Sequence, residues 1–264
     1  MSKKFNAALG AYEILKEKEG PLVLGIGTGS TTDYFTKEFL PKLKGKVSNL
    51  YSSSERTTKL LSELGFSICE YKPDNSIDIY IDGADEVDSN LNLIKGGGGA
   101  HTNEKKLAKQ SKEFICIVDD KKLVNCLGNF PLPVEISIKN SDAASLSLHN
   151  FSKNVTKRRE LSDNGNYLYD IHDFKIKDPD KIEKQILSID GVVDVGIFSI
   201  NKPSVVVAGL ELGYKLIESW IAFTICASSG SILWEKLLIS PSDVIKNLWK
   251  FQEGLSLVNL YNFL

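Results

Sequence analysis

The chain reads PLVLGIGTGSTT over residues 21–32, and this stretch decides the fold class. Its apolar first half predicts a short buried strand, and its glycines predict a turn. The apolar residues over 32–43 recur at helical spacing, so a helix is expected after the turn. A strand, a glycine turn and a helix in this order form the repeating unit of α/β folds.

Strands and helices are expected to alternate outward from this stretch. The expected strands cover residues 47–51, 77–81 and 114–118, and the expected helices cover residues 5–15, 57–64 and 104–110. Alternation of this kind predicts a mostly parallel sheet with helices on both faces, which is a Rossmann-like three-layer αβα architecture in the α/β class.

The pattern changes after Pro131, where strands and helices no longer alternate regularly. Strands are expected over residues 134–138, 167–176 and 192–200, and helices over 141–149 and 179–189. A strand at 204–209 can then return to the main sheet. We therefore predict a main domain of residues 1–131 plus 204–217, a smaller α+β domain of residues 132–203, and a C-terminal extension of residues 218–264.

Composition excludes several classes of protein. With 32 Lys and Arg against 34 Asp and Glu, the formal net charge is −2, so no broad cationic field would attract nucleic acid. Cys69, Cys116, Cys126 and Cys226 form no CxxC pair, which disfavours a zinc site and a disulfide framework and fits a reducing cytoplasm. The uncharged stretch 219–234 is shorter than the ~20 apolar residues of a membrane span, so a membrane anchor is not expected.

The glycine segment GIGTGSTT, residues 25–32, joins the first strand to a helix. Its glycines permit close backbone approach, and its amides and hydroxyls can face an anion, so it is a candidate phosphate site. It lacks the lysine of a P-loop and the third glycine of a dinucleotide-binding fingerprint. A tight turn without a ligand is the structural alternative.

The acidic segment DGADEVD, residues 82–88, falls where a strand is expected to end. In an open parallel sheet, ligands bind at the carboxyl ends of the strands. Three interpretations stay open for this run. It could be a solvated acidic turn, a Mg²⁺ site, or a set of acceptors for sugar hydroxyls.

Two further polar segments follow expected strands. KGGGGA, residues 95–100, lies between a strand-like run and a helix, where four glycines indicate close backbone approach. Glu104 falls in the first turn of that helix and is a candidate base, with helix capping as the alternative. DDKK, residues 119–122, is a candidate phosphate-binding loop or a charged surface loop. Four such segments at strand ends of one sheet predict a single site.

Taken in order, these segments resemble the ribose-5-phosphate isomerase A family. The resemblance rests on GIGTGSTT, SSSERT (52–57), DGADEVD, KGGGGAHTNEK (95–105) and FPLPVEI (130–136), and it continues through DNGN, YDIH and GVVDVGIF as far as about residue 217. It implies that the smaller domain is a lid. It also implies a cytoplasmic homodimer or homotetramer that interconverts ribose 5-phosphate and ribulose 5-phosphate, in the pentose phosphate pathway, through a cis-enediol, with neither metal nor cofactor.

The resemblance also implies a role for each site residue. Glu104 would be the base, Lys95 and the next glycines would stabilise the enediolate, and Asp82 and Asp85 would bind hydroxyls and assist ring opening. Lys4 is a further candidate at the phosphate. The implied substrate-binding residues are Thr28, Gly29, Ser30, Thr31, Asp82, Gly83, Ala84, Asp85, Lys95, Gly96, Gly97, Gly98 and Lys122.

The chain departs from the family pattern at three places. Lys121 stands where many relatives have serine, so assigning the phosphate to Lys122 depends on a gap-free alignment. His101, Thr102 and Asn103 replace more usual leucine- and arginine-type residues before Glu104. His101 could contact the substrate, but we expect it on the surface at the start of a helix. Residues 217–264 extend beyond the usual end, and apolar residues at helical spacing over 232–239 and 244–251 leave packing, association or no role open.

Two other functions compete with an isomerase. One is a sugar-phosphate sensor without catalysis, but Glu104 is present and no basic helix-turn-helix precedes the domain. The other is a Mg²⁺-dependent phosphohydrolase that uses the acidic segment, but the first strand ends in glycine and threonine, where an aspartyl nucleophile is expected.

Overall fold

The computed structural model describes residues 2–72, 76–218, 221–222 and 238–239. The chain forms two compact units, Met1–Ile217 and Glu218–Leu264. Within the second unit, strand β14 (Ile221–Ala222) pairs antiparallel with β15 (Leu238–Ile239). Strand β15 comprises the last two residues of 232–239, where helical spacing of apolar residues occurs in the sequence. Residues 232–237 and 244–251 lie outside the described ranges.

The first unit is built around a six-stranded sheet of order β13-β12-β6-β3-β1-β2. Its strands are β1 (Leu22–Ile26), β2 (Val47–Ser52), β3 (Ile77–Asp82), β6 (Ser111–Asp119), β12 (Val205–Gly209) and β13 (Tyr214–Glu218). From β2 to β12, every neighbouring pair is parallel. The apolar runs of β1, β3, β6 and β12 are buried on both faces, as a covered parallel sheet requires, whereas the edge strand β2 has exposed residues at Ser48 and Asn49.

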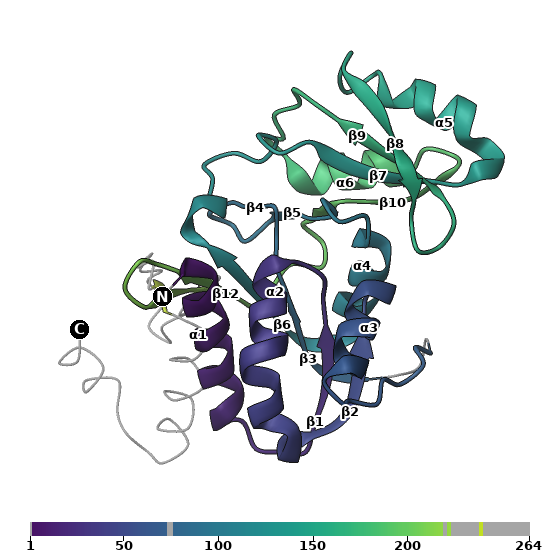
Figure 1. The fold of residues 1–264 in the computed structure, drawn as a ribbon. Helices are drawn as coiled ribbons and strands as arrows, with labels where there is room; N and C mark the ends of the chain where they lie inside the picture. The colour runs from purple at the N-terminus through teal and green to yellow at the C-terminus, as the bar shows by residue number, and fades with distance from the viewer. Residues whose placement is uncertain (1, 73–75, 219–220, 223–237, 240–264) are drawn as a thin grey trace, which may run out of the picture. The chain divides into compact units, whose positions relative to one another are not determined.

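Helices cover both faces of this sheet, which confirms the three-layer α/β fold (Figure 1). Successive residues of β6 alternate between the layers, so Ile115 and Ile117 pack on one side, and Phe114 and Cys116 on the other. Helix α1 (Lys3–Glu17) lies on the first side, and α4 (His101–Gln110) contributes to the core of the second. Helix α3 (Glu55–Glu63) contacts β2.

The helix after the glycine turn is less regular than predicted. It begins as α2 (Ser30–Tyr34), continues as one π-helical turn over Phe35–Phe39, and ends as a 3₁₀ helix over Leu40–Lys46. Pro41 lacks the amide proton that an α-helix would need at this position, which accounts for a change of hydrogen-bonding pattern there.

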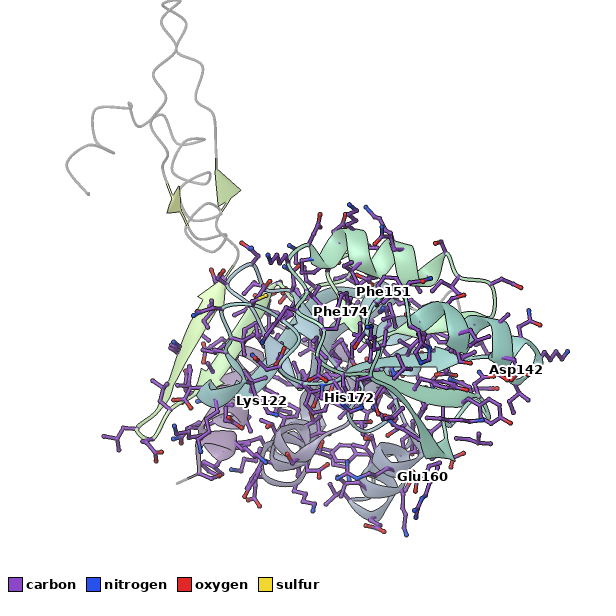
Figure 2. All side chains as sticks on the ribbon, turned by 90° about the horizontal axis from the view of Figure 1, so that it is seen from above. Lys122, Asp142, Phe151, Glu160, His172 and Phe174 are labelled. Carbon is purple, nitrogen blue, oxygen red and sulfur yellow. The ribbon has the colours of Figure 1, made fainter. Side chains whose placement is uncertain are left out.

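The smaller domain contains an antiparallel sheet of order β10-β7-β9-β8 (Figure 1). Its strands are β7 (Leu132–Ile136), β8 (Val155–Leu161), β9 (Tyr167–Ile171) and β10 (Val192–Val195), with helices α5 (Ser141–Leu148) and α6 (Pro179–Leu187). Its own apolar core includes Phe151 and Phe174, which are labelled in Figure 2. Their rings meet edge to face.

Two strands of this region are shorter than predicted. β9 ends at Ile171 because the chain turns at Asp173, which has a positive φ of 53°. The strand expected over residues 192–200 is divided at Gly196 into β10 and β11 (Ile197–Phe198). A Cβ at Gly196 would lie 2.2 Å from the carbonyl oxygen of Lys95, so only glycine permits this crossing of two backbones.

A small three-stranded sheet links the two larger ones and presents Lys95 to the site. Strand β5 (Leu93–Ile94) pairs with β4 (Glu86–Val87) and with β11. The next amide, that of Lys95, donates to Gly196 O at 2.8 Å. None of the helices within the described ranges combines the length and the apolar character that crossing a membrane requires.

Candidate active site

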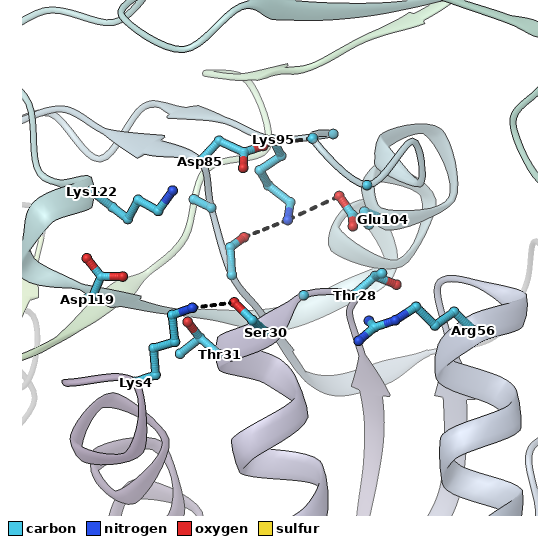
Figure 3. Close-up of a pocket in the computed structure, with 16 residues that line it drawn as sticks. Lys4, Thr28, Ser30, Thr31, Arg56, Asp85, Lys95, Glu104, Asp119 and Lys122 are labelled. Atoms are coloured by element: carbon cyan, nitrogen blue, oxygen red, sulfur yellow. Dashed lines mark hydrogen bonds and ion pairs between the residues drawn. The ribbon is translucent and has the colours of Figure 1, made fainter. Parts of the chain in front are cut away.

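A pocket of about 330 Å³ opens at the carboxyl ends of β1, β3 and β6, within the size range of small-molecule sites (Figure 3). All four predicted segments contribute to it. It is lined by Lys4, Thr28, Gly29, Ser30, Thr31, Arg56, Gly83, Ala84, Asp85, Lys95, Gly96, Gly97, Gly98, Glu104, Asp119 and Lys122.

The glycine segment after β1 forms one end of the pocket. A Cβ at Gly27 would lie 1.8 Å from the Asp82 carboxyl carbon, so glycine is required where β1 and β3 come together. The hydroxyl of Thr28 lies within 3.1 Å of the hydroxyls of Ser53, Ser54 and Thr57. These bonds fix the segment against the start of α3.

Three cationic side chains surround this end. Lys4 donates to Ser30 Oγ at 2.8 Å, and Lys122 enters from the 3₁₀ turn after β6 (Figure 3). Lys122 lines the pocket, whereas Lys121 is not among the lining residues. Arg56 also reaches the pocket and forms an ion pair with Asp33. Cationic groups, hydroxyl groups and the backbone of the glycine segment therefore line the same space. This combination is suited to binding an anion.

Asp82 lies behind the pocket wall and is completely buried. Its carboxylate accepts from the amides of Thr28 at 2.9 Å and Gly83 at 2.7 Å, from Lys95 Nζ at 2.7 Å, and from the hydroxyls of Tyr80 and Thr32. Because these five donors occupy its oxygens, the structure does not bring Asp82 to the pocket surface, although the sequence predicted a hydroxyl contact.

Lys95 and Glu104 form the buried end of the pocket. Lys95 Nζ lies 3.1 Å from Glu104 Oε2 and donates to Gly83 O at 2.6 Å (Figure 3). Burial would lower the pKa of Lys95, but the carboxylates of Asp82 and Glu104 outweigh it, so the net shift is upward and the ammonium stays charged.

The carboxyl group of Glu104 has an unusual environment. Burial, reinforced by the charge of Asp82, raises its pKa to about 8, and Lys95 opposes the shift. The ion pair with Lys95 lacks hydrogen-bond geometry, so no described residue donates a hydrogen bond to Glu104 Oε2. A carboxylate that is buried, raised in pKa and incompletely satisfied inside a pocket is characteristic of an acid–base residue.

Asp85 and the glycine loop, residues 96–99, close the wall beside Lys95. The Asp85 carboxylate accepts from the Gly97 amide at 2.8 Å. Burial raises the pKa of Asp85, and the bond to Gly97 and the charge of Lys95 oppose that shift. Asp85 itself remains partly exposed to the pocket, unlike Asp82.

His101 is buried, so the expectation of a surface position is wrong. The glycine loop folds back over the start of α4, and a Cβ at Gly96 would lie 2.7 Å from His101 Nδ1. The ring contacts the backbone of Asp194, but neither nitrogen meets a described residue in hydrogen-bond geometry. Burial and the charge of Lys105 lower the pKa of His101 to about 4.

The rest of the acidic segment does not gather around the pocket. Glu86 accepts the amides of Gly128 and Phe130 at 2.6 Å each, and Asp88 accepts those of Asn90 and Asn92. Among the described residues, no three His, Cys, Asp or Glu side chains are grouped as metal ligands would be. The run is therefore used for turns and for holding loops.

Sequence reasoning assigned no role to two pocket residues and to one that acts from outside. Arg56 follows the end of β2, so the same strand-end rule that found the other segments could have found it. Asp119 lines the pocket immediately before the Lys122 turn. Arg158, which contacts the glycine loop from β8, had no local signal because it is 61 residues away from Gly97.

The fold and the pocket together define an α/β protein with a small-molecule site, in which cations and hydroxyls line one end and the buried Lys95–Glu104 pair lies at the other. A family model described as ribose 5-phosphate isomerase A (phosphoriboisomerase A) matches residues 50–212. The chain belongs to the ribose-5-phosphate isomerase A family.

Several relatives support this membership. The ribose-5-phosphate isomerase A of Stenotrophomonas maltophilia (strain R551-3) is 39% identical over 205 residues, which are 77% of this chain and 95% of the relative. That of Baumannia cicadellinicola subsp. Homalodisca coagulata is 38% identical over 220 residues, which are 83% of this chain and 98% of the relative. The crystal structure of ribose 5 phosphate isomerase A from Neisseria gonorrhoeae is similar with a TM-score of 0.77 at 37% identity, covering 82% of this chain and 96% of that one.

Proposed function

We propose that this chain interconverts D-ribose 5-phosphate and D-ribulose 5-phosphate through a cis-enediolate. The observation that carries the proposal is Glu104, a buried carboxyl group of raised pKa beside the Lys95 ammonium in the pocket. The relatives named above carry this activity in their names. The reaction needs one group to move a proton between adjacent carbons, and neither a metal nor a cofactor is assigned to it.

The phosphate would bind at the exposed end of the pocket. The backbone and hydroxyls of residues 28–31, with Lys122 and Lys4, supply donors and positive charge there. Asp85 is placed to accept hydrogen bonds from sugar hydroxyls, because it lies between this end and Lys95. This arrangement points the carbonyl end of the open-chain sugar toward Glu104.

Proton transfer then occurs at the buried end. The Glu104 carboxylate removes the proton from C2 of the aldose, and the electron pair moves to the C1 oxygen to give the enediolate. Lys95 stabilises that negative oxygen. The proton of the C2 hydroxyl passes to the C1 oxygen, which moves the negative charge to the C2 oxygen, and Glu104 then returns its proton to C1 as the C2 oxygen becomes the ketone. Burial makes Glu104 more basic than a carboxylate in water, which favours removal of a proton from carbon.

Asp82 is assigned a positioning role in this scheme. It holds Lys95 Nζ and the Thr28 amide with one carboxylate, so it connects the phosphate end to the enediolate end. The contributions predicted from the sequence for Asp82 and Asp85 are thereby separated, with Asp85 facing the sugar and Asp82 supporting Lys95.

The test is conversion of ribose 5-phosphate to ribulose 5-phosphate with EDTA present. The wild type should turn over, Glu104→Gln should lose about 10³-fold in kcat, and the exposed control Glu160→Gln should match the wild type (Figure 2). No conversion by the wild type would refute the function. Loss of turnover on adding EDTA would revive a metal mechanism, and full activity of Glu104→Gln would remove the base assignment.

We also propose a homodimer or homotetramer in the cytoplasm, and a division of the first unit into a main domain (1–131 plus 204–217) and a lid domain (132–203). Exposed apolar side chains such as Leu146 and Leu212 are compatible with association. The two separately formed sheets support the domain division. Light scattering after size-exclusion chromatography measures the number of subunits, and a monomer would contradict the proposed association.

A further inference from the structure

Arg158 reaches the active-site loop from the smaller domain. It lies on β8, and its Nε and Nη2 donate to the two oxygens of Asp170, on β9, at 2.8 and 2.7 Å. This two-pronged ion pair is mostly buried, with side-chain exposures of 17% and 16%. Such a pair fixes the plane of the guanidinium and leaves Nη1 with a defined direction.

The remaining nitrogen holds two consecutive carbonyl groups of the glycine loop. Arg158 Nη1 donates to Gly96 O at 3.0 Å and to Gly97 O at 3.2 Å. The loop contains four glycines, which have the greatest backbone freedom of all residues, so an external contact is needed to select one conformation. Gly96 O also accepts the Gly99 amide at 2.9 Å, which closes the turn.

Fixing these carbonyls also fixes the amides on the other side of the loop. In a trans peptide the C=O and the following N–H point in opposite directions. Holding Gly96 O therefore directs the Gly97 N–H away from Arg158, and it meets the Asp85 carboxylate at 2.8 Å. Holding Gly97 O directs the Gly98 N–H the same way. Gly98 lines the pocket, and within the described part of the chain nothing accepts its amide proton.

From this geometry we propose that Arg158, held by Asp170, is a positioning residue that presents the Gly98 amide to the enediolate oxygen beside Lys95. The proposal deepens the proposed isomerase function and rests on it. The guanidinium charge lies on the carbonyl side of both peptide groups, so it also polarises them and strengthens their N–H donors. The smaller domain thereby takes part in transition-state stabilisation without touching the substrate.

The experiment compares Arg158→Met with Arg159→Met in the full chain. Arg159 is the matched control because it is the next residue on β8 and its side chain is exposed. Arg158→Met should lower kcat by about tenfold to a hundredfold, less than removal of a direct donor, while KM for ribose 5-phosphate changes by less than about threefold. Arg158→Lys keeps the positive charge but not the two-pronged ion pair with Asp170. Its kcat should therefore lie between that of the wild type and that of Arg158→Met.

A second readout separates positioning from a general loss of structure. Amide hydrogen exchange of the peptide that contains residues 96–100 should accelerate in Arg158→Met and not in Arg159→Met. Stabilisation by inorganic phosphate in a thermal shift assay should be the same in both, because the phosphate end lacks contact with Arg158. If Arg158→Met does not fold, Asp170→Asn, which loosens the fork, must lower kcat in the same way.

The outcomes distinguish this inference from the function on which it rests. A wild type without isomerase activity would refute the proposed function. An active wild type with unchanged kcat in Arg158→Met, an effect confined to KM, or an equal loss of kcat in Arg159→Met would overturn the role of Arg158 alone.

Discussion

Two buried lysines, ten positions apart, have almost the same surroundings and different uses. Lys95 meets the carboxylates of Asp82 and Glu104 and a backbone carbonyl, and Lys105 meets those of Glu183 and Asp194 and a backbone carbonyl. Both lysine side chains are 2% exposed. Both ammonium groups also lie over the ring of Phe198, at 5.4 and 4.9 Å from its centre.

The difference lies in the carboxylates. In the Lys105 cluster, Glu183 also accepts from the amides of Ser199 and Ile200 and from the Ser199 hydroxyl. The cluster therefore joins α4 to the smaller domain, and its carboxylates have their hydrogen-bond donors within the protein. In the Lys95 cluster, Glu104 Oε2 meets Lys95 only as an ion pair, has no hydrogen-bond donor among the described residues, and belongs to a residue that lines the pocket. A buried ion cluster thus stabilises where every group is satisfied and becomes chemically useful where one carboxylate is left incomplete.

The largest expected contrast comes from deleting each ammonium group. Lys95→Met should lower kcat by about 10²–10³-fold, because the enediolate loses its cation. Lys105→Met should instead destabilise the fold by about 3–5 kcal/mol, because two carboxylates stay buried without their partner, and its kcat per folded molecule should fall much less than in Lys95→Met. Urea unfolding and initial rates measure both quantities. A larger kcat loss in Lys105→Met would break the comparison.

Lysines outside the two buried clusters should give a smaller effect that is confined to binding. Lys122→Ala should raise KM for ribose 5-phosphate about tenfold, as expected for the loss of one charge-assisted hydrogen bond. Lys121→Ala, at the neighbouring position outside the pocket lining, should change KM by less than about twofold. Steady-state kinetics on the pair decides the assignment, and the reverse order would transfer the phosphate contact to Lys121.

The two clusters should also differ in the pH dependence of stability. Folding raises the pKa of Glu104 from near 4.5 to about 8, so the folded state holds an extra proton in that range and loses stability as pH rises through it. Glu104→Gln removes this dependence. The difference in free energy of unfolding, variant minus wild type, should therefore increase as pH rises from about 5 to about 8. Glu183→Gln should be less stable than the wild type at pH 7. Chemical denaturation at several pH values measures this difference. A difference between Glu104→Gln and the wild type that does not change with pH would show that folding does not raise the pKa of Glu104.

The smallest expected effect concerns His101, which packs against the glycine loop and feels the charge of Lys105. Its pKa falls from 6.5 to about 4 on folding, so the folded state resists protonation and stability is lost as pH falls below 6.5. His101→Leu should remove that loss and add about 1 kcal/mol at pH 7, because two unsatisfied ring nitrogens leave the core. A leucine variant that is less stable than the wild type both at pH 7 and below pH 6.5 would show that the ring is required for packing.

The sequence predicted those features that local pattern determines. Short apolar runs located β1, β3 and β6, and the rule that ligands bind at the carboxyl ends of parallel strands gathered Thr28, Lys95 and Lys122 into one pocket. Glu104 was found by its place in the first turn of α4, and the family resemblance gave it a role.

Other features depend on packing between distant segments and were not predictable from pattern. The burial of Asp82 results from Gly27 pressing against its carboxyl group, and the burial of His101 results from the fold of the glycine loop. Arg158 contributes through a contact from strand β8 to the distant glycine loop. Hydrophobic periodicity reports which face of an element is buried, but not which polar side chains a neighbouring element will cover.

The central claim is that Glu104 moves a proton between C2 and C1. Isomerisation in D₂O, followed by NMR, measures this directly. The wild type should incorporate solvent deuterium at C1 of ribulose 5-phosphate, and Glu104→Gln should lose both exchange and turnover while Glu160→Gln retains them. Undiminished deuterium incorporation or undiminished turnover in Glu104→Gln would contradict the mechanism.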